Sequence, residues 1–382
     1  MAAKIKNLKK VANRILKAVQ DKERVIIYGD SDPDGVTAVI ILEEALKELG
    51  LSAKAIYFPD RESEGYGMNE TALNYLKKYA PALFITLDCG IGNVKEVEIA
   101  KKMGFEVIII DHHKMLPEIP KASILCDPKQ EGDKYPFKEL STAGIIYWLI
   151  KLLFASVGQK YKPEQYLELV AISTLADMMI VEQDNEKFVR EGLLALNFTK
   201  RQGLIALMDI TDFKNWDVEE VRKKIISPLN AGQTKKHFNE AYLLLIEKDF
   251  KKARTKAKKL IQKADKRRED IYAITGEVKD RVVDNDQEII FEGSKNWPLY
   301  LLGPSASRAC QRFEKPVFLF TRGEKESPGA VRMPKGLDAV KAMISCKELL
   351  KTYGGHPLAA GFRVKNENIE KFKECLIKYF KG

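Results

Sequence analysis

Hydrophobic and polar positions in the first third of the chain follow a rhythm that predicts a parallel β-sheet. Short β-rich runs, RVIIY, AKAIYF, ALFITL and EVIII, alternate with segments of helical apolar spacing at 36–49, 69–79 and 93–102. Alternation of this kind is typical of parallel strands covered by helices on both faces. We therefore expect functional side chains beyond the carboxyl ends of these strands, where ligands bind in such sheets.

The pattern becomes helical after residue 140. Residues 141–226 show helical spacing without strong strand signals, which predicts a helical cap that completes the first domain. The longest apolar stretch, 143–157, is interrupted by Lys151 and is shorter than the roughly 20 residues that cross a bilayer, so it predicts a buried helix. The N-terminal segment also has helical spacing and lacks the features of a signal peptide.

A long helix and a second domain are predicted in the last third of the chain. An apolar stripe at helical spacing runs from Phe250 to Ala264. After Asn285, the runs EIIFE, PLYLL and PVFLF lie between glycine and proline turns and predict the strands of a smaller domain. We therefore predict an α/β fold with a parallel-sheet domain at 1–200, a helical connector at 201–284 and a smaller α/β domain at 285–382.

The charge of the chain is concentrated on the long helix. Lys and Arg number 64 against 54 Asp and Glu, and the net charge of +10 favours a polyanionic partner such as nucleic acid. Residues 251–268 contain ten basic residues and one acidic residue. A solvated linker helix has the same pattern, but one face repeats cations that we expect to bind backbone phosphates: Lys252, Lys256, Lys259, Lys263 and Arg267.

Composition excludes several classes of protein. A hydrophobic fraction of 45% is that of a globular chain, which excludes wholesale disorder and fibrous structure. The five cysteines are scattered and include no CxxC pair, so neither a disulfide framework nor a zinc ribbon is predicted. A reducing cytoplasm is the expected location, and no membrane contact is expected.

The first candidate for chemistry is the run VIIYGDSDPDG. It places Asp30, Asp32 and Asp34 directly after a strand, and three carboxylates so close repel one another unless cations lie among them. The spacing also matches the start of a calcium-binding EF-hand. That motif requires Glu at its twelfth position, where this chain has Ile41, and a helix rather than a strand before it.

More acids and histidines follow the next strands. Asp88 ends the third strand, the fourth strand ends in Asp111, His112 and His113, and Asp177 closes an apolar helix. Oxygen ligands with a histidine suit Mn²⁺ or Mg²⁺ better than metals that prefer thiolates. Carboxylates around one or two such ions are what phosphodiester hydrolysis needs. No GxSxG sequence supports serine chemistry instead.

A glycine-rich sequence near the C-terminus is a candidate for a second phosphate contact. TYGGHPLAAGF places Gly354 and Gly355 before His356, which offers backbone N–H groups and an imidazole to an anion. A plain glycine turn is the alternative interpretation.

The ordered set DSDPDG, DCG, DHH, LAD and GGH resembles the DHH phosphoesterase superfamily over nearly the whole chain. GYG at 65–67, GPSASRACQRFEKPVFLF and GGHPLAAGF are most similar to its RecJ-type single-strand exonucleases. The resemblance implies a parallel-sheet DHH domain with a helical cap, joined by a long helix to a smaller DHH-associated domain across a nucleic-acid groove. It also implies one or two Mn²⁺ or Mg²⁺ ions.

The resemblance implies roles for individual residues as well. The metal ligands, with Asp88 bridging two ions, are Asp30, Asp32, Asp34, Asp88, His112 and Asp177. His113 contacts the scissile phosphate or protonates the leaving oxygen, and Asp111 orients the neighbouring histidine. The implied contacts to substrate in the second domain are Arg308, Arg332, Gly354, Gly355 and His356.

Two substitutions and one missing module depart from the RecJ pattern. RecJ-type proteins have Ser-x-Arg where this chain has Ala330-Val331-Arg332, and an Arg where it has Gln233. Both changes weaken the inferred grip on a terminal phosphate. Bacterial RecJ proteins also carry an OB-type nucleic-acid module after the second domain, which we do not expect here, so the direction and processivity of digestion stay open.

We predict a metal-dependent exonuclease that degrades single-stranded DNA, or RNA, to mononucleotides from the 5′ end in DNA repair, recombination or replication. Replication or repair proteins are its expected partners. One alternative is a phosphodiesterase for short oligoribonucleotides, cyclic dinucleotides or a nucleotide bisphosphate, although the basic helix favours longer substrates. Another is a non-catalytic replication or repair subunit. The presence of every expected metal ligand argues against that alternative.

Overall fold

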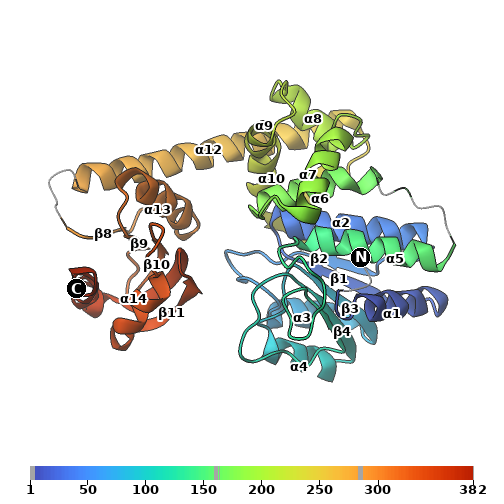
Figure 1. Ribbon diagram of the computed structural model, residues 1–382, viewed down its shortest axis with the longest axis horizontal. Coiled ribbons are helices and arrows are strands. Elements are labelled where there is room, and N and C mark those ends of the chain that lie inside the picture. Colours follow the sequence, from blue (N-terminus) through green and yellow to red (C-terminus); the bar gives the residue numbers. More distant parts are fainter. Residues whose placement is uncertain (1–4, 159–161, 163, 283–286, 382) are drawn as a thin grey trace. The chain divides into compact units, whose positions relative to one another are not determined.

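The computed structural model describes residues 5–158, 162, 164–282 and 287–381. These residues form two compact units, Met1–Ala264 and Asp265–Gly382, each with its own β-sheet (Figure 1). The segment 201–284, predicted as a connector, is therefore divided between them. Helix α12, Phe250–Val282, begins in the first unit and ends in the second.

The first unit contains the predicted parallel sheet. Its five strands lie in the order β2-β1-β3-β4-β5, and every neighbouring pair is parallel. The fifth strand is only three residues long and was not predicted. The strands are β1 (Val25–Gly29), β2 (Ala55–Tyr57), β3 (Ala82–Leu87), β4 (Phe105–Ile110) and β5 (Ile124–Cys126).

Helices cover both faces of this sheet, as the alternating pattern predicts (Figure 1). Side chains such as Ile27 and Ile85 pack with α1 (Leu8–Gln20), α2 (Pro33–Glu48) and α5 (Thr142–Ser156) on one face. Their neighbours Ile26 and Phe84 point to the other face and pack with α3 (Glu70–Leu76) and α4 (Val94–Lys102). Because both faces are buried, the strands are apolar throughout rather than alternating.

A helical cap follows α5, as predicted for 141–226. It leads through a small hairpin, β6 (Thr234–Lys235) and β7 (Phe238–Asn239), that the sequence did not predict. Outside the cap, short 3₁₀ turns occur at Lys77–Tyr79 in the first unit and at Lys347–Leu349 and Asn366–Asn368 in the second. The cap contains α6 (Glu164–Ala176), α7 (Gln183–Leu196), α8 (Gln202–Ile210), α9 (Val218–Val221), a π-helical turn (Arg222–Ile226), α10 (Ser227–Asn230) and α11 (Glu240–Leu245).

The second unit is the predicted smaller α/β domain. Its sheet has the order β11-β12-β10-β9-β8, in which only the β8–β9 pair is parallel. The strands are β8 (Ile290–Ser294), β9 (Val317–Thr321), β10 (Glu326–Arg332), β11 (Leu350–His356) and β12 (Ala359–Lys365). The helices are α13 (Leu299–Phe313), α14 (Ala339–Ser345) and α15 (Ile369–Lys381).

Two predictions for the second unit were wrong. The run PLYLL is not a strand, because Pro298 caps helix α13 and the apolar residues Leu301 and Leu302 begin its buried face. The scattered cysteines also predicted no disulfide framework, but Cys346, at the end of α14, is bonded to Cys375 in α15. In the described part of the chain, no helix is long and apolar enough to cross a membrane.

Candidate metal centre

The predicted acidic side chains gather at the carboxyl edge of the first sheet. Asp30 and Asp32 follow β1, Asp88 follows β3, and the Asp111–His113 run follows β4. Asp32 is also the N-cap of α2 and accepts a 3.0 Å hydrogen bond from the backbone N–H of Gly35. The sequence DPDG therefore turns the chain sharply from strand to helix, and this turn brings Asp34 into the first helical turn.

Gly35 is essential to this turn. A Cβ atom at position 35 would lie 2.4 Å from the backbone oxygen of Asp30. We expect Gly35→Ala to lower the free energy of unfolding by about 1–3 kcal/mol, the usual cost of overpacking. Gly276→Ala is a matched control, because position 276 lies in helix α12 and a Cβ atom there would meet open space. That change should leave stability equal or improved. Equal effects in thermal or urea unfolding would contradict the prediction.

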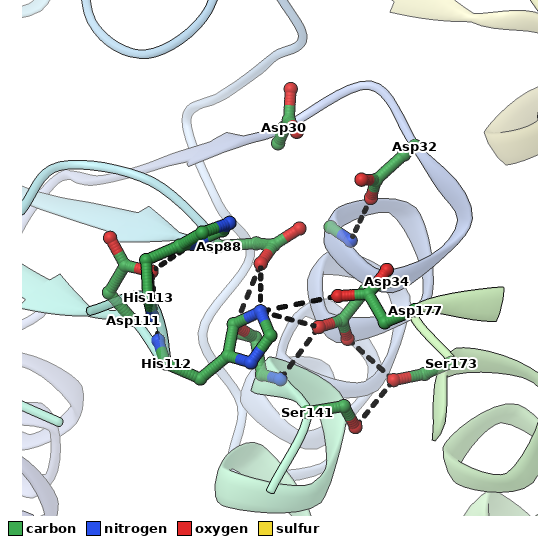
Figure 2. Close-up of polar contacts among 12 residues, drawn as sticks. Asp30, Asp32, Asp34, Asp88, Asp111, His112, His113, Ser141, Ser173 and Asp177 are labelled. Atoms are coloured by element: carbon green, nitrogen blue, oxygen red, sulfur yellow. Dashed lines mark hydrogen bonds and ion pairs between the residues drawn. The ribbon is translucent and has the colours of Figure 1, made fainter. Parts of the chain in front are cut away.

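The closest cluster of candidate ligands surrounds His112. Its Nε2 lies 3.2 Å from Asp88 Oδ1, 3.2 Å from Asp177 Oδ2 and 3.7 Å from Asp34 Oδ2 (Figure 2). Asp177 follows helix α6 of the cap and lies beside His112 at the edge of the sheet. Ligand atoms of these four residues all lie within 4.8 Å of one another. The arrangement can hold a metal ion.

Several polar atoms in this cluster are buried without a hydrogen-bond partner among the described residues. They are Asp88 Oδ2 and both ring nitrogens of His112. Buried polar groups in proteins are nearly always hydrogen-bonded or bound to an ion. Asp88 also adopts a φ of +62°, in the left-handed region that few residues other than Gly, Asn and Asp visit readily. These features are those of a site shaped around a cation.

Neighbouring carboxylates raise the pKa values of Asp32, Asp88 and His112. Burial and the nearby Asp177 and Asp34 carboxylates raise the pKa of Asp32 to about 7. Burial, with the charge of Asp34, raises the pKa of Asp88 well above its usual range. Burial alone would lower the pKa of His112, but the carboxylates of Asp177 and Asp34 raise it to about 9. Protons thus relieve the repulsion that a divalent cation relieves in a metal site.

Hydrogen bonds fix the orientation of two ligands. Asp34 accepts bonds from the backbone N–H groups of Thr142 (2.7 Å) and Ala143 (2.9 Å) and from Ser173 Oγ (2.5 Å). Thr142 Oγ1 donates to Asp88 Oδ1 at 3.1 Å. Sequence analysis missed Thr142 and Ser173. The only available signal was Ser141, the N-cap of the apolar helix α5, whose hydroxyl lies 2.6 Å from Ser173 Oγ.

Asp30 and Asp32 form a second group of possible ligands together with Asp88. Arg61, which sequence analysis also missed, lies against this group. Its Nε donates to Asp30 Oδ1 at 2.9 Å, and its terminal nitrogen contacts both Asp30 Oδ2 and Asp32 Oδ2, the latter at 3.0 Å. The structure therefore brings Asp30 into the site but pairs it with a guanidinium.

Asp111 contacts the side chain of His113. Its carboxylate contacts His113 Nδ1 at 2.8 Å and accepts backbone bonds from Ile91 (3.1 Å) and His112 (2.8 Å). Burial opposes ionisation, but the bond to His113 holds the pKa of Asp111 below its usual range. Tyr66, a further residue missed from the sequence, places its hydroxyl 3.2 Å from the same His113 nitrogen and donates to the Asp88 carbonyl at 3.0 Å.

The predicted substrate contacts of the second unit lie on α13, β10 and β11. The exposed Arg308 places its guanidinium carbon 3.9 Å from the centre of the Tyr272 ring. The half-buried Arg332 donates to Ser307 Oγ at 2.9 Å. Gly354, Gly355 and His356 end the exposed edge strand β11.

The cations of α12 differ in their surroundings. Lys252 and Lys259 are exposed. Lys256 pairs with Glu247 at 2.6 Å, and Lys263 pairs with Glu240 and donates to Gln233 Oε1 at 3.0 Å. Arg267 lies on the same helix, in the part that belongs to the second unit. Two of the predicted cations, Lys256 and Lys263, are therefore already paired with acidic side chains of the protein.

Both units match known domain families. Residues 24–174 match the DHH family, N-terminal domain, and residues 286–382 match the DHHA1 domain. The single-stranded-DNA-specific exonuclease RecJ of Bacillus subtilis is 33% identical over 378 residues, which cover 97% of this chain and 47% of that protein. The chain spans about half the length of the first curated relatives it matches, 47% and 54%.

Solved RecJ structures have a similar fold over the whole chain. A crystal structure of exonuclease RecJ bound to manganese matches with a TM-score of 0.84 and 28% identity, covering 99% of this chain and 95% of that one. RecJ from Thermus thermophilus in complex with Mn²⁺ matches with a TM-score of 0.85 and 26% identity, covering 99% and 55%. The chain is a RecJ-like member of the DHH superfamily.

Proposed function

We propose that this chain is a divalent-metal-dependent exonuclease that hydrolyses single-stranded DNA to mononucleotides from the 5′ end. The observation that carries the proposal is the cluster of Asp34, Asp88, His112 and Asp177 at the edge of the parallel sheet, in which Asp88 Oδ2 and both His112 ring nitrogens are buried without a hydrogen-bond partner among the described residues. The names of the RecJ relatives, single-stranded-DNA-specific exonucleases, support the substrate. We extend the proposal to a role in DNA repair, recombination or replication.

We propose Mn²⁺ or Mg²⁺ as the cofactor, one or two ions. The donor set is rich in carboxylate oxygens and has one imidazole, which suits these ions, and the RecJ structures were solved with Mn²⁺. Asp34, Asp88, His112 and Asp177 would hold one ion, and Asp32 with Asp88 a second. When bound, such ions polarise the phosphodiester and make a bound water more acidic.

The remaining residues of the site have roles in binding and proton transfer. We assign His113 to the scissile phosphate or to the leaving oxygen, to which it would donate a proton. Asp111 and Tyr66 fix the orientation of its ring through Nδ1, so that Nε2 is the atom left for the substrate. In the second unit, we assign Arg308, Arg332 and the Gly354–His356 segment to substrate phosphates.

The experiment that tests this function is digestion of single-stranded DNA and RNA 20-mers labelled separately at each end, with Mn²⁺, Mg²⁺ or EDTA. We expect immediate, metal-dependent release of the 5′ label as a mononucleotide. Release of the 3′ label first would overturn the polarity. Intact 20-mers beside cleaved dinucleotides would instead favour a phosphodiesterase for small substrates.

Backbone binding by α12 makes a separate prediction. Lys252 and Lys259 are exposed, whereas Lys256 and Lys263 pair with Glu247 and Glu240. We expect Lys252→Gln with Lys259→Gln to reduce the slope of log affinity against log salt by about 1.4, since each single-strand phosphate contact contributes about 0.7. The double variant of Lys256 and Lys263 is the control, and it should change the slope less. Equal slopes in both double variants and the unmodified protein would refute phosphate binding by the two exposed lysines.

A further inference from the structure

A surface of lysines and aromatic rings lies at the end of β2, outside the metal centre. Two segments distant in sequence form it, one at the end of α3 and in the 3₁₀ turn after it, and the other in the β6–β7 hairpin. We call it the lysine–aromatic patch. Its members are Tyr75, Lys78, Lys235, Lys236, His237 and Phe238.

His237 joins the two segments. The centre of its ring lies 4.1 Å from that of Tyr75 and 4.3 Å from that of Tyr57, and Lys78 Nζ lies 3.9 Å from the Tyr75 ring centre. The backbone N–H of Phe58 donates to the carbonyl of His237 at 3.1 Å. These contacts fix the hairpin against the end of the edge strand β2.

The same hairpin is attached to the loop that carries Asp30 and Asp32. Thr234 Oγ1 lies 3.1 Å from the hydroxyl of Ser31, and Asn239 Nδ2 donates to the Ser31 carbonyl at 2.8 Å. Strand β2 neighbours β1 in the parallel sheet. The patch therefore lies along the same carboxyl edge of the sheet as the metal ligands, one strand further out.

The side chains of the patch are available to a ligand. Lys78, Lys235 and Lys236 are exposed, and Tyr75 and Phe238 are 41% and 42% exposed. Lys235 has one acidic neighbour, Glu240, at 3.9 Å. Among the described residues, no acidic side chain forms an ion pair with Lys78 or Lys236.

The turn of the hairpin adds an independent observation. Its two central residues, Lys236 and His237, have φ angles of +50° and +69°. Two-residue hairpin turns with positive φ at both positions strongly prefer Asn and Gly. Backbone strain of this kind persists where the surrounding structure imposes it and is concentrated at functional positions. Here it places a lysine and an imidazole where a simple turn needs neither.

We propose that the lysine–aromatic patch binds the part of a single strand that extends beyond the nucleotide at the metal centre. This inference rests on the proposed function. Exposed lysines beside exposed rings are the combination that binds unpaired nucleic acid, because the cations neutralise phosphates and the rings stack with bases. Lys263 of α12 contacts Gln233 at the start of the hairpin, so the patch is continuous with the basic helix.

Binding without catalysis tests the proposal directly. Fluorescence anisotropy of a labelled dT20 in EDTA reports affinity while hydrolysis is prevented. The test variant combines Lys78→Gln, Lys235→Gln and Lys236→Gln. We expect it to bind dT20 at least about tenfold more weakly and to reduce the salt slope by about 2, three contacts at about 0.7 each. Phe238→Leu should weaken binding about fivefold or more with an unchanged salt slope, because stacking releases no counterions.

The control is an equal change of charge elsewhere on the first unit. Lys9→Gln, Lys10→Gln and Lys102→Gln alter three exposed lysines of α1 and α4. The proposal would be overturned if this control lost as much dT20 affinity as the test variant and its salt slope fell by as much. An equal loss for duplex DNA would overturn the single-strand assignment.

Hydrolysis distinguishes a failure of the patch from a failure of the proposed function. With Mn²⁺, the patch variant should cleave a dinucleotide at the normal rate and a 20-mer more slowly. If it binds and cleaves 20-mers normally, the patch is refuted and the exonuclease proposal stands. If the unmodified protein binds dT20 but cleaves nothing, and the patch variant loses dT20 binding, the exonuclease proposal fails and the patch stands.

Discussion

Asp88→Asn is expected to reduce metal-dependent hydrolysis by at least about 10³-fold, the order of loss when a group that stabilises transition-state charge is removed. Asn is the appropriate replacement, because the φ of +62° at this position is tolerated by Asn but strained for Ala. The amide oxygen can still accept the bond from Thr142. The variant therefore removes charge from the centre while keeping its shape, and the rate of mononucleotide release with Mn²⁺ measures the effect.

The control for Asp88→Asn is another buried carboxylate outside the centre. Asp133 has a fully buried side chain that pairs with Lys138 and accepts the backbone N–H of Lys6. Asp133→Asn should lower stability but retain most of the specific activity of the folded protein. If Asp88→Asn keeps more than a tenth of the activity at saturating Mn²⁺, the metal centre assigned here is wrong.

Mn²⁺ affinity is expected to rise about 10³-fold between pH 6 and pH 8. In the metal-free protein the pKa of His112 is raised to about 9 and that of Asp32 to about 7. Both groups are therefore protonated at pH 6, and binding must displace at least these two protons. Each displaced proton contributes about tenfold per pH unit below the pKa of its group and less near it, so the rise is about 50-fold from pH 6 to 7 and about 20-fold from pH 7 to 8.

The measurement is the loss of the free Mn²⁺ electron paramagnetic resonance signal as protein is added at each pH. His112→Gln removes one of the two protons, so its affinity should be lower overall and should change only about tenfold over the same range, about 100-fold less than in the unmodified protein. A constant affinity from pH 6 to 8 would show that these groups do not ligate the ion.

The clustering of the candidate metal ligands was predictable because most of them follow strands in short acidic runs. A parallel sheet places the ends of β1, β3 and β4 at one edge, so Asp32, Asp88 and His112 had to lie near one another. Asp177 is different, since the sequence indicates only an acid after an apolar helix. Its position in the cluster was inferred from the resemblance, and its 3.2 Å contact with His112 depends on how the cap packs against the sheet.

The residues that sequence analysis missed act across long separations. Arg61 approaches Asp30 from a loop, and Ser173 approaches Asp34 from the cap. Neither residue has a pattern of its own, because one arginine or serine is compatible with any exposed loop or helix. The β6–β7 hairpin was missed for a related reason. Its strands are two residues long, too short for alternation to be visible.

Asp177 lies in the cap, so a metal ion bound to it would connect the cap to the sheet of the first unit. The other ligands of the cluster belong to the sheet edge and to α2, whereas Asp177 follows α6 in the cap. A cation bound by all of them would hold the cap against the sheet. Its removal by a chelator would leave the carboxylate of Asp177 facing those of Asp34 and Asp88. Amide hydrogen exchange at the ends of α6 and α7 should then quicken in EDTA, while the strands stay protected. The ion would govern how tightly the cap is held to the sheet as well as the hydrolysis proposed for this centre.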